Sequence, residues 1–582
     1  MVISIFTLTP NLQYKTQHMN ISMKRTSLLA ICGLVSSVLF AQKDEVPKGW
    51  HMMDKATTGY YGLSVDKAYQ FVKSKNLKSK TVIVAVIDSG IDTLHEDLKA
   101  VLWKNPKEIP GNGIDDDKNG YVDDIYGWNF LGGRDGQNVE QDSYEAARVY
   151  HKYKSKYSGK DIDPSSLSKD ERFEYEMWKR SENEIAGDSK DSGLELIFLK
   201  RAYTNCLKAD SILRKAMQKE KFTGKELGDY NPTDAEVKKA KNNLFSLMSG
   251  NDAMESTNEE FLEGFGDYVS GEEKKAEAGN TPPKTYRADV VKDNYSDFND
   301  KFYGNNDVMV SNKSALHGTH VSGIIAASRG NGKGMDGVAD NVKIMSLRAV
   351  PDGDEHDKDI ALAIRYAVDN GAHVINMSFG KSFSPEKKWV DEAVKYAESK
   401  GVLMVHAAGN DAKNLDTTFN YPTPQLLDGT RPNNWITVGA SGDPKAGGLT
   451  ANFSNYGKDE VDVFAPGVKI YSTVPGGNTY QNLQGTSMAS PVVAGLAAFI
   501  LEYYPNLSAA QVKMVIEKSS QKPVDKVKNP GNDEMVPLSN LSRAGGLVNA
   551  YEAIKLASTI KGERKTAPLK PIKSTVKPKT KG

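Results

Sequence analysis

Uninterrupted runs of β-branched and aliphatic residues recur along the chain and end in small or polar residues. Runs of this kind are typical of parallel strands that are buried on both faces of a sheet. They are TVIVAVIDSG (81–90), VKIMSLRAV (342–350), AHVINMSFG (372–380) and GVLMVHAAGN (401–410). The runs therefore predict a largely parallel sheet whose strands carry polar tips.

Helical patterns separate these runs. DIALAIRYAVDNG (359–371) places apolar residues on one helical face and stops at Asn370-Gly371, and EKKWVDEAVKYAESKG (386–401) repeats the design. Strands that alternate with amphipathic helices predict an α/β fold. Ligands of such sheets bind beyond the carboxyl ends of the strands, which is where Asp88 and Asn410 stand.

The segment 131–305 has a different composition. It is rich in Lys, Glu, Asp and Tyr, lacks buried-strand runs, and contains stretches with the apolar spacing of amphipathic helices, such as 143–157, 170–185, 194–217 and 234–248. We predict a charged helical insertion within an α/β domain formed by 42–130 and 306–560. A solvated, partly disordered insertion is the alternative. The Lys- and Pro-rich tail 561–582 is predicted to be disordered.

The first residues resemble an export signal. Lys24 and Arg25 precede the apolar run TSLLAICGLVSSVLF, and Ala41 provides a small residue at the expected cut. We predict a signal peptide over 1–41, with Met23 as the start, and a secreted, periplasmic or cell-surface protein. Lipid anchoring at Cys32 is the weaker alternative, because Ile31 precedes it. We expect no integral membrane span elsewhere.

Composition excludes several classes of protein. The 75 basic residues balance the 75 acidic ones, so no global field favours a nucleic-acid partner. The 2 cysteines, one inside the predicted signal peptide, exclude a disulfide framework.

Candidate chemistry lies in VIDSGID, HGTHVSG and GTSMASP, which carry Asp88, His317 and Ser487. Each has a structural alternative, because a strand-end Asp or a Gly-Thr-Ser turn often only caps a helix. Together they supply an acid, a base and a nucleophile in the order Asp, His, Ser, which is the chain order of subtilisin. The stretches NMSFG, AAGN, NFSNYG and VFAPG add to this pattern.

With these motifs the chain resembles the subtilisin-like serine proteases, over roughly residues 50–130 and 306–555. The resemblance implies a three-layer fold, with Ser487 as nucleophile, His317 as general base and Asp88 as the residue that orients it. It also implies that Asn410 and the Ser487 backbone N–H stabilise the oxyanion. A zinc site at His317 and His320 is disfavoured, because no Glu base stands in an HExxH pattern.

The resemblance also implies a substrate cleft. Ser378, Phe379 and Gly380 would form one wall and an edge that pairs with extended peptide. Ala407, Ala408 and Gly409 would form the opposite wall, and Asn420 the pocket floor.

The acidic stretch NGIDDDKNGYVDD (112–124) sets oxygen-bearing side chains at alternate positions around Gly120. Such spacing suits Ca²⁺, although Tyr126 stands where the closing Glu of an EF-hand belongs. An acidic turn held by side-chain-to-backbone bonds is the alternative. The predicted structural calcium ligands are Asp115, Asp117, Asn119, Asp123 and Asp124.

The sequence thus predicts a secreted serine endopeptidase that acts on proteins or peptides, binds calcium and needs no organic cofactor. Two alternatives remain open. The chain could be a catalytically silent interaction protein that keeps the fold, or an esterase or transpeptidase on the same triad.

Overall fold

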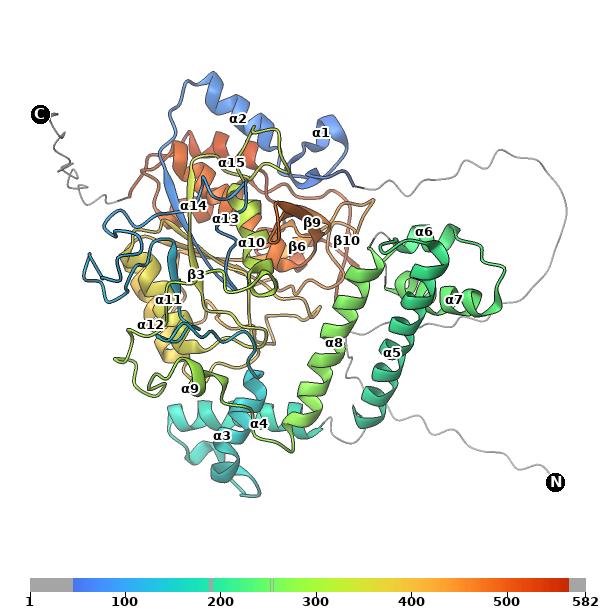
Figure 1. Ribbon diagram of the computed structural model, residues 1–582. Helices are drawn as coiled ribbons and strands as arrows, with labels where there is room; N and C mark the ends of the chain where they lie inside the picture. The colour runs from blue at the N-terminus through green and yellow to red at the C-terminus, as the bar shows by residue number, and fades with distance from the viewer. Residues whose placement is uncertain (1–45, 188–191, 252, 255, 565–582) are drawn as a thin grey trace, which may run out of the picture. The chain divides into compact units, whose positions relative to one another are not determined.

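The computed structural model describes residues 46–187, 192–251, 253–254 and 256–564. The chain divides into two compact units, one over residues 146–283 and the other over 46–145 and 284–564. The predicted signal peptide and most of the predicted C-terminal tail lie outside the described residues. Figure 1 labels the helices of both units and several strands of the larger one.

The larger unit is built on a seven-stranded sheet of order β2-β3-β1-β4-β5-β6-β7. Every neighbouring pair of these strands is parallel. The strands are β1 (Val82–Asp88), β2 (Gly127–Asn129), β3 (Val342–Arg348), β4 (Val374–Met377), β5 (Leu403–Ala407), β6 (Trp435–Ser441) and β7 (Val463–Pro466). The predicted parallel sheet is therefore confirmed, and its β1, β3, β4 and β5 fall within the apolar runs.

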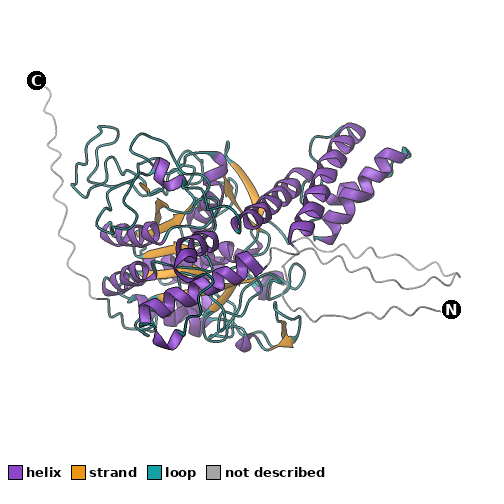
Figure 2. Ribbon diagram, turned by 90° about the horizontal axis from the view of Figure 1, so that it is seen from below, coloured by secondary structure: helices purple, strands orange, loops and turns teal. Residues whose placement is uncertain are grey.

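Helices cover both faces of the sheet, which completes three layers (Figure 2). One apolar cluster includes Val84 of β1 and residues of α2 (Val65–Ser74), α10 (Asn312–Ala326), α13 (Thr486–Tyr503), α14 (Ala509–Ser519) and α15 (Ala550–Ala557). A second cluster includes Ala85 of β1 and residues of α11 (Asp357–Asp369) and α12 (Lys387–Ser399). Successive residues of a strand point to opposite faces, so β1 supplies both clusters. The predicted α/β three-layer class is confirmed.

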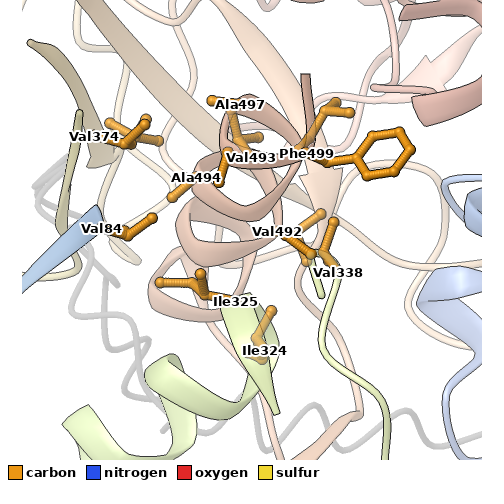
Figure 3. Packing of buried hydrophobic residues seen from close by; sticks show 14 of the residues in the cluster. Val84, Ile324, Ile325, Val338, Val374, Val492, Val493, Ala494, Ala497 and Phe499 are labelled. Carbon is orange, nitrogen blue, oxygen red and sulfur yellow. The ribbon is translucent and has the colours of Figure 1, made fainter. Parts of the chain in front are cut away.

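The core helix α13 lies at the centre of the first cluster, where Val492, Val493 and Ala497 pack near Val84 and Ile325 (Figure 3). Among the described residues, it is the one helix with the length and composition of a membrane span, and 89% of that stretch is buried inside the protein. Its apolar character is explained by the core it fills.

Smaller elements complete this unit. They are the helices η1 (Trp50–Met52), α1 (Lys55–Thr58), α9 (Tyr286–Val290) and η4 (Leu538–Asn540), and the antiparallel pairs β8 (Ile470–Val474) with β9 (Thr479–Leu483) and β10 (Val527–Lys528) with β11 (Met535–Val536).

The helical unit has an apolar core of its own, which includes Leu213, Leu244 and Phe265. Its elements are α3 (Glu145–Tyr157), η2 (Pro164–Ser166), α4 (Lys169–Gly187), α5 (Ser192–Met217), α6 (Gly224–Asp229), α7 (Ala235–Gly250) and α8 (Asn258–Ala278). The sequence pattern anticipated α3, α4, α5 and α7 and missed α8. This unit is shorter than the predicted insertion 131–305, because the stems 131–145 and 284–305 belong to the α/β unit.

Candidate active site

The three candidate catalytic residues stand at the ends of secondary elements of the α/β unit. Asp88 is the last residue of β1, His317 lies in the second turn of α10, and Ser487 lies in the first turn of α13. Because β1 is parallel to its neighbours, Asp88 shares the carboxyl edge of the sheet with Met377, which ends β4 and precedes Ser378. The topology therefore gathers residues that are far apart in sequence at one edge.

His317 and Asp88 form a direct pair. His317 Nδ1 donates to Asp88 Oδ1 at 2.7 Å, and the Ser89 backbone N–H donates to the same oxygen at 2.8 Å. Burial of the ring lowers the pKa of His317, while the charge of Asp88 and its hydrogen bond raise it; the net pKa lies above the ordinary 6.5. The pair therefore fixes one tautomer, with Nε2 left to accept a proton.

Ser487 Oγ is held by the substrate edge in this structure. It donates to the Ser378 carbonyl oxygen at 3.1 Å, and Ser378 Oγ donates back to the Ser487 carbonyl oxygen at 2.9 Å. No hydrogen bond joins Ser487 Oγ to His317 within the described residues. The Ser487 side chain must rotate before His317 can take its proton. Catalytic hydrogen bonds often form fully only when substrate binds.

Asn410 is oriented by Thr486. Asn410 Oδ1 accepts from the Thr486 backbone N–H and from Thr486 Oγ1, both at 2.9 Å. Asn410 Nδ2 has no acceptor within the part of the chain that the structure describes. A Cβ placed on Gly485 would lie 3.4 Å from Asn410 Nδ2 and 3.6 Å from the Ser487 backbone nitrogen. Two N–H donors therefore flank a small space that the glycine leaves open.

An open cavity of about 320 Å³ adjoins Ser487. Five residues predicted for the cleft line this cavity, and so do Asn410, Thr486 and Ser487. Asp411 also lines it, and no sequence motif indicated that residue. The five predicted cleft residues are Phe379, Gly380, Ala407, Gly409 and Asn420. Its volume falls in the range of small-molecule and peptide side-chain pockets.

The remaining predicted cleft residues lie behind this lining. Ala408 is fully buried, and its carbonyl accepts from the side chains of Asn420 at 3.0 Å and Asn455 at 2.9 Å. Asn420 also donates to the Ala407 carbonyl, so its amide ties one wall of the cavity to the loop that precedes Tyr421. Ser378 lies behind the edge, in the contact with Ser487 already described. Asn455 belongs to the NFSNYG stretch, which was the sequence's only indication of its position.

His320 is separate from this chemistry. Its ring is fully buried, and Nε2 lies 3.1 Å from the Gln481 carbonyl oxygen. Burial is the main cause that lowers its pKa to about 3, so the ring is neutral at physiological pH. The structure gives His317 and His320 different partners, as expected of a base and a packed neighbour.

The acidic loop differs from its predicted arrangement. Asp115 and Asp117 lie together with Glu108, and one oxygen of each falls within 4.8 Å of the others. The three other predicted calcium ligands are engaged elsewhere.

Asp123 accepts from the backbone N–H groups of Gly111, Asn112 and Gly113. Asp124 accepts from the side chains of Asn105, Asn119 and Tyr366. The side chain of Asn119 thus donates to Asp124, while its backbone N–H donates to Asp115 Oδ1. Glu108 was missed because it lies outside the acidic stretch.

The fold and the site define the class of protein. A profile of the subtilase family matches residues 79–537, and the chain belongs to that family.

Characterised relatives agree with this assignment. The thermophilic serine proteinase of Bacillus sp. strain AK1 is 42% identical over 207 residues, which is 35% of this chain and 47% of that protein. Subtilisin DY of Bacillus licheniformis is 43% identical over 200 residues, 34% of this chain and 67% of its own. The match thus spans about half to two thirds of these relatives. They support a peptide hydrolase of the subtilisin-like serine protease class.

A solved protease of Pseudoalteromonas arctica PAMC 21717 aligns with 87% of this chain and 96% of its own, at 19% identity and a TM-score of 0.43.

Proposed function

We propose that this chain is a serine endopeptidase that hydrolyses peptide bonds through an acyl-enzyme intermediate. One observation supports the proposal above the others: the 2.7 Å contact between His317 and Asp88 stands at the same sheet edge as Ser487, which lies in the first turn of α13. Membership of the subtilase family supports the same chemistry.

The reaction follows from the groups at hand. His317 Nε2 removes the proton of Ser487 Oγ as that oxygen attacks the carbonyl carbon of the peptide bond. The same proton then passes from His317 to the leaving amine, the C–N bond breaks, and the acyl group stays on Ser487. Water repeats the cycle, with His317 as base, and releases the acid. Asp88 stabilises the imidazolium and does not itself become protonated.

The tetrahedral intermediate requires hydrogen-bond donors that are already in place. Asn410 Nδ2 and the Ser487 backbone N–H would supply them, since Thr486 holds Asn410 with its oxygen turned away. The Ser487 N–H is among the first N–H groups of α13, which have no acceptor within the helix. Preorganised donors of this kind lower the barrier because they need not reorient during the reaction.

We also propose that the protein acts outside the cytoplasm. The motif around Lys24 and Ala41 supports export, and one relative is a cell wall-associated protease of Bacillus subtilis strain 168, 36% identical over 227 residues. N-terminal sequencing of the chain recovered from the culture medium and from the cell envelope tests this proposal. A new terminus after Ala41 supports signal cleavage, whereas a lipid-modified Cys32 at the terminus supports the anchored alternative.

Active-site titration with a fluorophosphonate probe tests the triad. We expect close to one label per chain on Ser487 by intact mass and peptide mapping, and no labelling of His317→Ala or Ser487→Ala. Folded wild-type protein that takes up no label would contradict the proposed mechanism and favour a catalytically silent interaction protein.

Paired substrates separate an endopeptidase from an esterase or transpeptidase. We expect cleavage of internal bonds in an unfolded protein such as casein, at sites identified by mass spectrometry. Turnover of esters without any peptide cleavage, or transfer of the acyl group to an added amine in preference to water, would instead support the alternatives.

A further inference from the structure

A buried lysine directly follows the substrate edge. Lys381 comes after Gly380, and its ammonium donates to Glu145 Oε2 and to the Glu355 carbonyl oxygen, both at 2.7 Å. Asp357 Oδ1 lies 2.9 Å from the same nitrogen. The side chains of Lys381, Glu145 and Asp357 are only 2%, 4% and 3% exposed. This ion cluster is therefore shielded from bulk water, and salt screens it little.

The backbone of Lys381 joins the wall that contains Gly380 to the segment that carries Asn420. Its N–H donates to the Tyr421 carbonyl at 3.1 Å, and the Tyr421 N–H donates back at 2.8 Å. Gly380 and Asn420, the residues just before each member of this pair, both line the cavity. The position of the Lys381 side chain therefore sets where two stretches of the cavity lining lie.

Glu145 connects this cluster to the root of the insertion. It is the first residue of α3, the helix that runs on into the helical unit, and its backbone N–H donates to Asp354 Oδ2 at 2.7 Å. Asp357 in turn accepts from Ser384 Oγ and from the Glu386 N–H, so the loop after the substrate edge is held at the same point. A buried cation loses its favourable position when one of its anionic partners is removed.

We propose that Lys381 is a positioning residue for the substrate-binding edge and that Glu145, at the start of α3, controls it. This inference rests on the proposed peptidase function and adds to it. The ion pair acts on the binding of extended substrate and leaves the chemistry at Ser487 unchanged. The backbone of α3 continues from Glu145 into the inserted segment, so the non-covalent ion pair links the start of that segment to the substrate edge.

The variant Glu145→Gln tests this proposal, since it keeps the shape of the side chain and removes its charge. Losing a charge-assisted hydrogen bond predicts that KM for a tetrapeptide p-nitroanilide chosen from a library rises about tenfold. The rate of fluorophosphonate labelling and the kcat for p-nitrophenyl butyrate stay within about twofold of wild type, because neither probe spans the edge. Lys381→Met leaves two buried carboxylates without their cation, so it serves only if circular dichroism shows it folded.

The matched control is Asp428→Asn, which breaks an exposed ion pair with Lys395 on α12. We expect wild-type KM from it, since exposed pairs contribute little. All rates are expressed per titrated Ser487. An unchanged KM in Glu145→Gln, or an equal loss on the peptide and both small probes, overturns the positioning role. A wild-type chain that takes no label refutes the proposed function instead.

Discussion

At the scale of single residues, the candidate active site is defined by how a few polar atoms are held. Asp88 directs one nitrogen of His317, and Thr486 directs the amide of Asn410. In both cases a neighbour uses one polar atom and leaves the other free to act. The chemistry expected of the site therefore depends on contacts that consist of only one or two hydrogen bonds each.

Removing the Asn410 amide should slow catalysis with little effect on binding. Asn410→Ala deletes one of the two proposed oxyanion donors, so we expect kcat to fall by about 10²–10³ while KM changes little. Steady-state kinetics on a peptide substrate measure this. Asn433→Ala, an exposed asparagine just before the amino end of β6, should behave as wild type. A large KM increase with unchanged kcat would point to a binding role for Asn410.

The pH dependence should reflect the raised pKa of His317. His317 must be neutral to accept a proton, so kcat/KM falls as pH decreases through its pKa. Because that pKa lies above 6.5, we expect the acid limb of the profile above pH 6.5. Asp88→Asn removes the charge that raises the pKa, so its limb moves to lower pH and kcat drops by about 10⁴. An unshifted limb in Asp88→Asn would show that another group controls the profile.

At the scale of elements, the site requires α10 to approach the end of β1 closely. A Cβ on Gly318 would lie 2.1 Å from the Gly90 carbonyl oxygen and 3.1 Å from Asp88 Oδ1. Only a residue without a side chain permits this approach, and the approach brings the preceding residue of α10, His317, within reach of Asp88. From the local sequence alone, Gly318 is a glycine within a helix, and such a glycine usually destabilises the helix.

Gly318→Ala should therefore reduce both stability and activity. We expect a loss of about 1–3 kcal/mol in the free energy of unfolding, because the added methyl group overpacks the contact. Fluorophosphonate labelling should slow as His317 moves from Asp88. The matched change Gly264→Ala lies in α8, where a Cβ meets nothing within 4 Å, and should stabilise by roughly 0.5–1 kcal/mol. Chemical denaturation and labelling rates measure both; equal behaviour of the two variants would contradict the close-contact explanation.

At the scale of the whole molecule, the two compact units have separate apolar cores. The helical unit packs around Leu213, Leu244 and Phe265, while α13 centres the core of the α/β unit. Each unit buries its own apolar surface, which is the general condition for a cooperative folding unit.

A core substitution in the helical unit should therefore leave the active site intact. Leu244 is fully buried, and Leu244→Ala should cost about 2–5 kcal/mol. We expect differential scanning calorimetry to show one of two transitions lowered and the labelling of Ser487 unchanged. Val492→Ala in α13 is the counterpart, and it should lower the other transition. A single transition that moves in both variants would show that the units unfold together.

Residues with a local pattern were predictable from sequence. The buried runs predicted β1, β3, β4 and β5, since parallel strands covered on both faces require continuous apolar residues. The motifs around Asp88, His317 and Ser487 identified the candidate triad because each stands at an element end. The apolar run after GTSMASP likewise predicted the core helix α13.

Residues whose partners are distant were not predictable. Glu108 joins Asp115 and Asp117 only after the loop folds back, and Lys381 meets Glu145 across 236 positions of sequence. The sequence grouped the stems 131–145 and 284–305 with the insertion, whereas they lie in the compact α/β unit, since residues such as Asn129 and Asn305 pair only in the folded chain. Amino-acid composition gives the average polarity of a segment, and it does not indicate which surface that segment packs against.

The sequence by itself determined the class of fold, the family resemblance and the candidate triad, because periodicity and short motifs are properties of neighbouring residues. Only the tertiary structure decided which acidic side chains converge, how Asn410 is turned, and that a buried ion pair ties the substrate edge to the root of the insertion. Those features depend on contacts between chain segments that are far apart in sequence, and they form only when the sheet and its helices are assembled.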